Sequence, residues 1–225
     1  MRYANRTEAG RKLALRLEAY TGAEDLIVLG LPRGGVPVAA TVAEQLGVPL
    51  DTYVVRKVGV PGHEELAMGA VAGAGVTVRN EFVLEHLGVP AEVFEEHAEA
   101  QRREVRRREE RYRRGLPSRE LRDRTVVLID DGLATGATMK AAVEAVRKSH
   151  PARLIVAVPV AARATAESLR QLLTGPGEEF ICLNEPEMLD GVGRWYDDFR
   201  QIDDDEVCQL LESAARQRAA RAAPS

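Results

Sequence analysis

The stretch VVLIDDGLATGATM, residues 126–139, is the most informative about the fold of this chain. It predicts a buried strand that ends in two adjacent carboxylates, Asp130 and Asp131, and then a loop of small residues and the start of a helix. Loop N–H groups at a helix N-terminus bind anions, because they are unpaired and lie at the positive end of the helix dipole. Carboxylates beside an anion site suit a ligand that has neutral hydroxyls or a metal next to its phosphate, as a sugar phosphate does. The alternative is a plain turn in which Asp131 caps the helix.

Strands alternate with helices on both sides of this stretch. Strands are predicted at 26–30, 50–55, 124–130, 153–161 and 178–183, and helices at 7–20 with Thr7 as N-cap, 36–46 closed by Gly47, 137–149 and 163–173. Such alternation predicts βαβ units. The expected fold is therefore α/β, a Rossmann-like doubly wound parallel sheet that binds its ligand beyond the carboxyl ends of the strands.

Two segments interrupt this alternation. Residues 56–80 are rich in glycine and predict a mobile loop and hairpin, and residues 90–114 predict one long charged helix that starts at Pro90. We therefore expect a single domain with a core at about 20–79 and 121–185, an inserted helical segment at about 80–120 and a C-terminal hood and tail at about 186–225. From about residue 212 the tail is expected to be a fraying helix followed by disorder.

A second motif, LIVLGLPRGGVPVA at 26–39, places Arg33, Gly34 and Gly35 between a strand and its helix. This pattern predicts another anion-binding turn, in which the forked guanidinium of Arg33 suits a diphosphate. A plain glycine turn is the alternative. If both turns lie at neighbouring strand ends, they can bind the two ends of one ligand.

With both motifs in this order, the chain resembles the type I phosphoribosyltransferases. The resemblance implies that Asp130 and Asp131 hold the ribose 2- and 3-hydroxyls of 5-phosphoribosyl-1-pyrophosphate (PRPP). It implies a ribose-5-phosphate loop formed by Gly132, Ala134, Thr135, Gly136, Ala137 and Thr138. It also implies a pyrophosphate loop at 32–35, often with a non-proline cis peptide. Gly132 departs from the family, which more usually has a bulkier aliphatic residue there.

The resemblance also implies a flexible loop after the second core strand, with Arg56 and Lys57 placed to neutralise the leaving pyrophosphate. Lys57, Arg33 and the two aspartates are then the catalytic candidates. Mg²⁺ is the implied cofactor, held mainly by PRPP and water, with no direct protein ligand assigned. Glu64 and Glu65 could contact Mg²⁺, a base or nothing, whereas His63 lacks a partner at metal-ligand spacing.

The acceptor site is the least specified part. Family members sandwich the base under a hood, which makes Leu133, Trp195 and Tyr196 candidate acceptor contacts; packing of the hood itself is the alternative. Ala134 stands where hypoxanthine–guanine enzymes have an Asp, and this argues against a 6-oxopurine acceptor. The expected activity is Mg²⁺-dependent transfer of 5-phosphoribosyl from PRPP to an unidentified, nucleobase-like small molecule.

Composition limits the other classes of function. The 225 residues carry a formal net charge of −4, and no apolar run approaches the ~18 residues that span a bilayer. The N-terminus lacks the apolar stretch of a signal peptide and only two cysteines are present, so we expect a cytoplasmic protein. A homo-oligomer is also expected.

The segment 101–124 holds eleven arginines and five acidic residues. Pairs such as Glu104 with Arg108 and Glu109 with Arg113 favour a solvated helix with i,i+4 ion pairs. A basic stripe that binds nucleic acid is the alternative. In that case the chain would be a regulator of this fold that senses PRPP or nucleotides and binds RNA or DNA.

Overall fold

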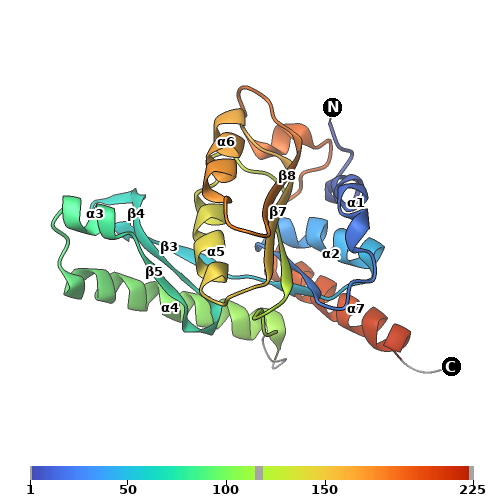
Figure 1. The fold of residues 1–225 in the computed structure, drawn as a ribbon, viewed down its shortest axis with the longest axis horizontal. Helices are drawn as coiled ribbons and strands as arrows, with labels where there is room; N and C mark the ends of the chain where they lie inside the picture. Colours follow the sequence, from blue (N-terminus) through green and yellow to red (C-terminus); the bar gives the residue numbers. More distant parts are fainter. Residues whose placement is uncertain (1, 115–118, 223–225) are drawn as a thin grey trace.

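The computed structural model describes residues 2–114 and 119–222. Its central sheet has five parallel strands in the order β2-β1-β6-β7-β8 (Figure 1). The strands are β1 (Leu26–Gly30), β2 (Leu50–Thr52), β6 (Thr125–Ile129), β7 (Arg153–Val160) and β8 (Glu178–Asn184). All five predicted core strands are present, although the one predicted at 50–55 ends at Thr52.

Helices cover both faces of this sheet, which confirms the doubly wound α/β fold. One face packs against α1 (Arg6–Arg16) and α2 (Gly35–Leu46), and the other against α5 (Ala137–Arg147) and α6 (Arg163–Leu172). Leu26 and Val28 of β1 point to the first face and Ile27 and Leu29 to the second. The continuous apolar run follows from this burial on both sides.

Two helix ends test the sequence signals. Gly47, at φ +70°, closes α2 as predicted. The N-cap of α1 is Asn5, whose side chain accepts a hydrogen bond from the Glu8 N–H, so the prediction of Thr7 was wrong. That helix ends at Arg16, and a 3₁₀ turn (Glu18–Tyr20) follows.

Residues 55–113 form a projecting unit that we call the arm (Figure 1). It contains an antiparallel sheet of β3 (Val55–Val60), β4 (His63–Ala72) and β5 (Thr77–Arg79), a 3₁₀ turn (Gly73–Gly75), and the helices α3 (Glu81–His86) and α4 (Ala91–Arg113). The long helix predicted from Pro90 is α4. Of the mobile loop and hairpin predicted at 56–80, the hairpin is found as β3 and β4, and β5 adds a third strand to it. The arm begins at residue 55, before the insertion predicted at about 80–120.

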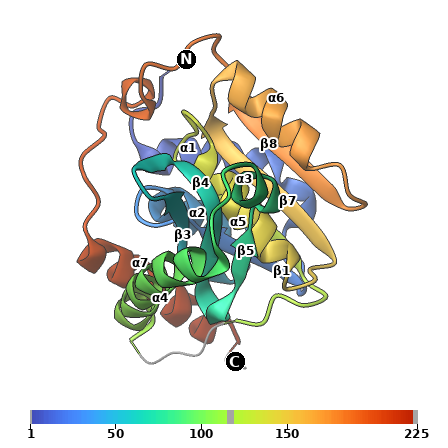
Figure 2. The ribbon, with the colours of Figure 1, turned by 90° about the vertical axis from the view of Figure 1, so that its left-hand side faces the viewer.

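The arm sheet lies between α4 and α5 (Figure 2). Val58 and Met68 face a cluster with Phe94 of α4, whereas Val55 and Ala70 join the cluster that contains α5. Alternating strand residues therefore serve two different helices, which ties the base of the arm to the core.

The C-terminal region also differs from expectation. Helix α7 begins at Asp204 and runs to Ala222, and its Val207 and Cys208 are fully buried against the arm. The helix predicted from about residue 212 is therefore present but begins earlier, at Asp204, and its residues 216–220 are exposed; residues 223–225, predicted to be disordered, lie outside the described part. Both cysteines are free thiols. In the described ranges, no helix has the length and apolarity needed to cross a membrane.

Candidate active site

The two predicted anion-binding turns adjoin. Strands β1 and β6 are hydrogen-bonded neighbours with Gly30 opposite Ile129, and the Leu31 N–H donates to the Ile129 carbonyl oxygen at 2.8 Å. The turns packed on them touch, because a Cβ added at Gly34 would collide with the Asp131 carboxylate. A Cβ added at Gly35 would lie 2.6 Å from the Ile129 carbonyl oxygen. The two turns therefore lie at neighbouring strand ends and touch, as the prediction of one shared site requires.

The loop after β6 is built by close backbone contacts. Gly136 adopts φ +68° immediately before α5, and a Cβ there would lie 2.7 Å from the Thr165 methyl group. The Thr165 hydroxyl donates to the Ala134 carbonyl oxygen at 2.6 Å. Thr135 and Thr138 are exposed, so the loop presents hydroxyls together with the first N–H groups of α5.

Gly132, the departure from the family pattern, has a steric reason. A Cβ at this position would lie 2.6 Å from a methyl of Val192 and 2.9 Å from one of Val160. Val192 belongs to a 3₁₀ turn (Val192–Trp195) of the C-terminal segment. The C-terminal segment therefore fills the space that a side chain at residue 132 would need.

The two aspartates occupy different environments. Asp131 is 9% exposed, and its Oδ2 accepts a hydrogen bond from Nε of Arg6 at 2.9 Å and lies 2.8 Å from Nη2 of the same guanidinium in an ion pair. Oδ1 of Asp130 accepts the Asp131 N–H at 2.9 Å. Burial, reinforced by the Asp131 charge, raises the pKa of Asp130 well above its ordinary value. Burial also raises the pKa of Asp131, although the Arg6 guanidinium opposes this.

Sequence reasoning missed Arg6, and it placed Tyr196 at the acceptor, whereas the structure places Tyr196 against Asp131. Arg6 lies 125 positions before Asp131, and nothing in the local pattern at 5–10 links it to the 126–139 stretch. Tyr196 is buried and donates its hydroxyl to the Asp131 carbonyl oxygen at 2.6 Å. Arg6 and Tyr196 therefore hold Asp131, a candidate ribose-binding residue, and both come from outside the two motifs.

The pyrophosphate candidates come from both units of the molecule. The Pro32–Arg33 peptide is cis, as the family resemblance implies, and Arg33 is exposed. Lys57 lies on β3 at the base of the arm and lines a cavity of about 360 Å³ together with Thr138 of α5. Arg56 lines the same cavity, but its Nε donates to Gln101 of α4 at 3.0 Å.

A second cavity, of about 640 Å³, separates the arm from α5 and α6. Lys57 and Ala137 are at its edge, and Val78, Lys140 and Leu172 are among the residues that line it. Because Lys57 borders both cavities, the space between arm and core reaches the first turn of α5.

The structure accounts differently for the three acceptor candidates. Leu133 is 3% exposed and packs in the core, and Tyr196 is 2% exposed, so neither side chain is open to an acceptor in this conformation. Trp195 is half-buried beside Tyr3 and Tyr196. Packing in the core therefore explains Leu133, and packing of the C-terminal segment explains Tyr196.

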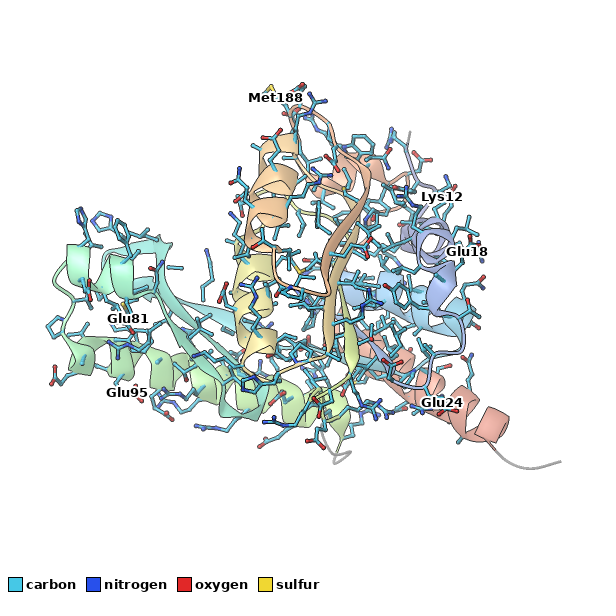
Figure 3. The ribbon with its side chains drawn as sticks, viewed as in Figure 1. Lys12, Glu18, Glu24, Glu81, Glu95 and Met188 are labelled. Carbon is cyan, nitrogen blue, oxygen red and sulfur yellow. The ribbon has the colours of Figure 1, made fainter. Side chains whose placement is uncertain are left out.

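The arginines of α4 are largely engaged by acidic groups. Glu104 binds Arg107 and Arg108, and Arg113 binds Glu109, which confirms both predicted i,i+4 pairs. Arg111 pairs with Asp204 of α7. Glu95, on the side of α4 away from the arm sheet (Figure 3), binds Arg102. These ion pairs favour the solvated helix over the nucleic-acid stripe.

Among the described residues, no cluster of three or more His, Cys, Asp or Glu side chains could hold a metal ion. His63 is exposed. The side chains of Glu64 and Glu65 lie outside the described part of the structure. The hard oxygen donors at the site are the carboxylates of Asp130 and Asp131, which are of the type that Mg²⁺ accepts alongside substrate phosphates and water.

Comparison with known proteins agrees with this geometry. A family model, the phosphoribosyl transferase domain, matches residues 3–174. Proteins named "Putative phosphoribosyl transferase" from the CDC 1551 and H37Rv strains of Mycobacterium tuberculosis are 42% identical over 214 residues. This match covers 95% of the present chain and 47% of theirs, so the chain spans about half the length of these curated relatives.

A solved structure shares nearly the whole fold. The crystal structure of TT1426 from Thermus thermophilus has a TM-score of 0.85 and 42% identity, and the match covers 95% of this chain and 99% of that one. The arrangement of core and arm is therefore common to both chains.

Proposed function

The chain belongs to the phosphoribosyl transferase domain family, and we propose that it transfers a 5-phosphoribosyl group from PRPP to a small, nucleobase-like acceptor with release of pyrophosphate. The observation that carries the proposal is the contact between the two turns, through Gly34 and the Asp131 carboxylate. PRPP has phosphate groups at both ends of one ribose. Adjoining anion-binding turns at neighbouring strand ends suit such a ligand.

In this proposal the core holds the sugar. The loop at 132–138 and the first turn of α5 bind the 5-phosphate, because their N–H groups and threonine hydroxyls are donors at the positive end of the helix dipole. Asp130 and Asp131 accept hydrogen bonds from the ribose hydroxyls. This binding fixes C1 relative to the turn at 32–35.

Arg33 and Lys57 neutralise the leaving group. The acceptor nitrogen forms a bond to C1 as the bond from C1 to the pyrophosphate oxygen breaks, through a transition state with oxocarbenium character. No covalent enzyme nucleophile is required. The protein contributes orientation and charge, and Lys57 brings its charge from the arm rather than from the core.

We further propose Mg²⁺ as the cofactor. When bound, it would neutralise charge on the pyrophosphate oxygens, and PRPP and water would supply most of its ligands. Asp130 and Asp131 are the carboxylates nearest to that role, through the ribose hydroxyls that they hold.

The 360 Å³ cavity between Lys57 and Thr138 must narrow if water is to be excluded from C1. Movement of the base of the arm toward α5 would achieve this. The acceptor remains to be found among nucleobases and related heterocycles. A homo-oligomer and a cytoplasmic location stay predictions.

The test is pyrophosphate release from PRPP and Mg²⁺ across a panel of bases. We expect turnover with at least one base and a loss of about 10- to 100-fold in Asp131→Asn, because a hydrogen-bond acceptor is removed from the ribose. The control is Asp190→Asn, whose carboxylate pairs with Arg194 on the surface and should leave the rate unchanged. Absence of both turnover and PRPP binding in the unmodified protein would contradict the proposal.

A further inference from the structure

Arg6 is a charged side chain in an unusual position for the first residue of a helix. It is 8% exposed, and its guanidinium is held on three sides. Nε and Nη2 bind Oδ2 of Asp131, Nη1 donates to the Arg200 carbonyl oxygen at 3.0 Å, and the Phe199 ring centroid lies 3.9 Å from Cζ. An arginine held so closely has one orientation, because both its hydrogen bonds and its flat face are used.

These contacts of Arg6 fix the orientation of the Asp131 carboxylate. Its Oδ2 is covered by Arg6 and by the backbone of Gly34, and its carbonyl oxygen accepts the Tyr196 hydroxyl. The carboxylate therefore keeps Oδ1 as its acceptor for a ligand. Asp130 is similar, since its Oδ1 already accepts a backbone N–H. Each carboxylate therefore has one oxygen that binds the protein, Oδ2 of Asp131 through Arg6 and Oδ1 of Asp130 through a backbone N–H.

We propose that Arg6 is a positioning residue of the ribose site, which orients Asp131 so that Oδ1 accepts a hydrogen bond from one ribose hydroxyl of PRPP. The inference rests on the proposed function, because it assigns Arg6 to the binding of that substrate. It also gives a role to the C-terminal segment 196–200, whose backbone and aromatic side chains hold Arg6 in place.

The charges around Asp131 predict a measurable signature. Arg6 is the cation in contact with this carboxylate, and Asp130 and Tyr196 are the other titratable groups beside it. Arg6 holds down a pKa that burial raises, so loss of the guanidinium raises the pKa of Asp131 further. PRPP binding needs the ionised carboxylate, and it should then fail at a higher pH than in the unmodified protein.

The experiment measures PRPP binding by calorimetry in the presence of Mg²⁺, across pH 5 to 8, for the unmodified chain, Arg6→Gln and Arg6→Lys. We expect Arg6→Gln to weaken PRPP binding about tenfold or more at neutral pH. The pH below which binding is lost should also be higher than in the unmodified chain. Arg6→Lys should recover part of the affinity, because a lysine restores the positive charge but not the paired N–H donors of the guanidinium.

A matched control separates positioning from stability. Arg147→Gln removes an ion pair with a largely buried Glu178 on the far edge of the sheet, and it should lower the melting temperature without changing the binding profile. A second control is the double variant Arg6→Gln with Asp131→Asn. It should bind PRPP no more weakly than Asp131→Asn alone, because Arg6 acts through that carboxylate.

Two results would overturn the inference. One is an Arg6→Gln protein that binds PRPP with unchanged affinity and an unchanged pH profile. The other is a double variant whose loss of binding free energy equals the sum of the losses in Arg6→Gln and Asp131→Asn. If Arg6→Gln fails to fold, Arg6→Lys and its double variant with Asp131→Asn provide the same comparison. If the unmodified chain does not bind PRPP, the proposed function itself fails and the role of Arg6 falls with it.

Discussion

The core and the arm both bring residues to the candidate site, but they are built in different ways. The core strands are buried on both faces, and the turns that leave β1 and β6 touch through backbone and a single carboxylate. The arm packs a small sheet under a helix whose outer side is a series of exposed ion pairs. Contacts of backbone on backbone tolerate no added atom, whereas exposed ion pairs contribute little individually. We therefore expect the site to be sensitive to small changes in the core and tolerant of most changes on the arm.

A pair of glycine substitutions should show the largest difference. In Gly35→Ala the new Cβ meets the Ile129 carbonyl oxygen and the Asp130 backbone, so both turns must shift. In Gly69→Ala it meets the Val78 carbonyl oxygen and the Phe94 ring within the arm. Each overpacked site should cost about 1–3 kcal/mol of stability. We expect ribose 5-phosphate binding to be lost only in Gly35→Ala. Equal binding losses, measured by calorimetry, would contradict the separation of the two units.

Lys57→Ala tests the contribution of the arm to the chemistry. The core should still bind ribose 5-phosphate normally, because Lys57 lies on β3 and not in the 132–138 loop. Pyrophosphate affinity and turnover should fall by about 10- to 100-fold, because a cation is removed from the leaving group. Lys148→Ala, an exposed lysine after α5, is the control and should change neither quantity. Weaker ribose 5-phosphate binding in Lys57→Ala would place this lysine at the other end of the ligand.

Acidification should affect the two regions in opposite ways. The folded-state pKa of Asp130 is raised, so its ionised form opposes folding and this cost disappears as the pH falls through that pKa. In the proposed function PRPP binding uses the ionised form, so binding should weaken over the same range. Hydrogen bonds from Arg107 and Arg108 lower the pKa of Glu104 from 4.5 to about 2. The stability it contributes is present above about pH 4.5 and is lost as the pH falls toward 2.

As the pH falls from neutral toward about 4.5, hydrogen exchange in α4 should therefore stay unchanged, while calorimetry should show PRPP binding growing weaker. Simultaneous loss of binding and of α4 protection in this range would show that the two regions are not independent.

The smallest effect is expected at the tip of the arm. Phe82 of α3 is 75% exposed, and Phe82→Ala should change the free energy of unfolding by no more than about 0.5 kcal/mol. Thermal denaturation measures this directly. Leu84→Ala, two residues further along α3 but 3% exposed, is the matched comparison and should cost about 2–5 kcal/mol. A large loss in Phe82→Ala would mean that the tip is covered in solution.

Features that depend on residues close together in the sequence were predicted correctly, and features that depend on distant residues were not. The five core strands, the turns at 31–35 and 130–138, and the Gly47 cap depend on neighbouring residues, and all are found. In the arm the β3–β4 hairpin was predicted but the third strand was not, because the pairing of β4 with β5 closes over a glycine-rich segment whose short apolar runs resemble a loop. Helix α7 was placed too late, because its first turn, Asp204, Asp205 and Glu206, carries no apolar pattern.

Local sequence was enough to predict the doubly wound sheet and the two anion-binding turns, because apolar runs, glycines and carboxylates at strand ends act over short distances along the chain. Long-range packing alone brings Arg6 onto Asp131, buries Tyr196 against the same residue, and carries Lys57 to the site on a separate sheet. An ion pair between residues 125 positions apart depends on how two helices and a C-terminal segment pack around the sheet. No periodicity or motif in a single chain records that packing.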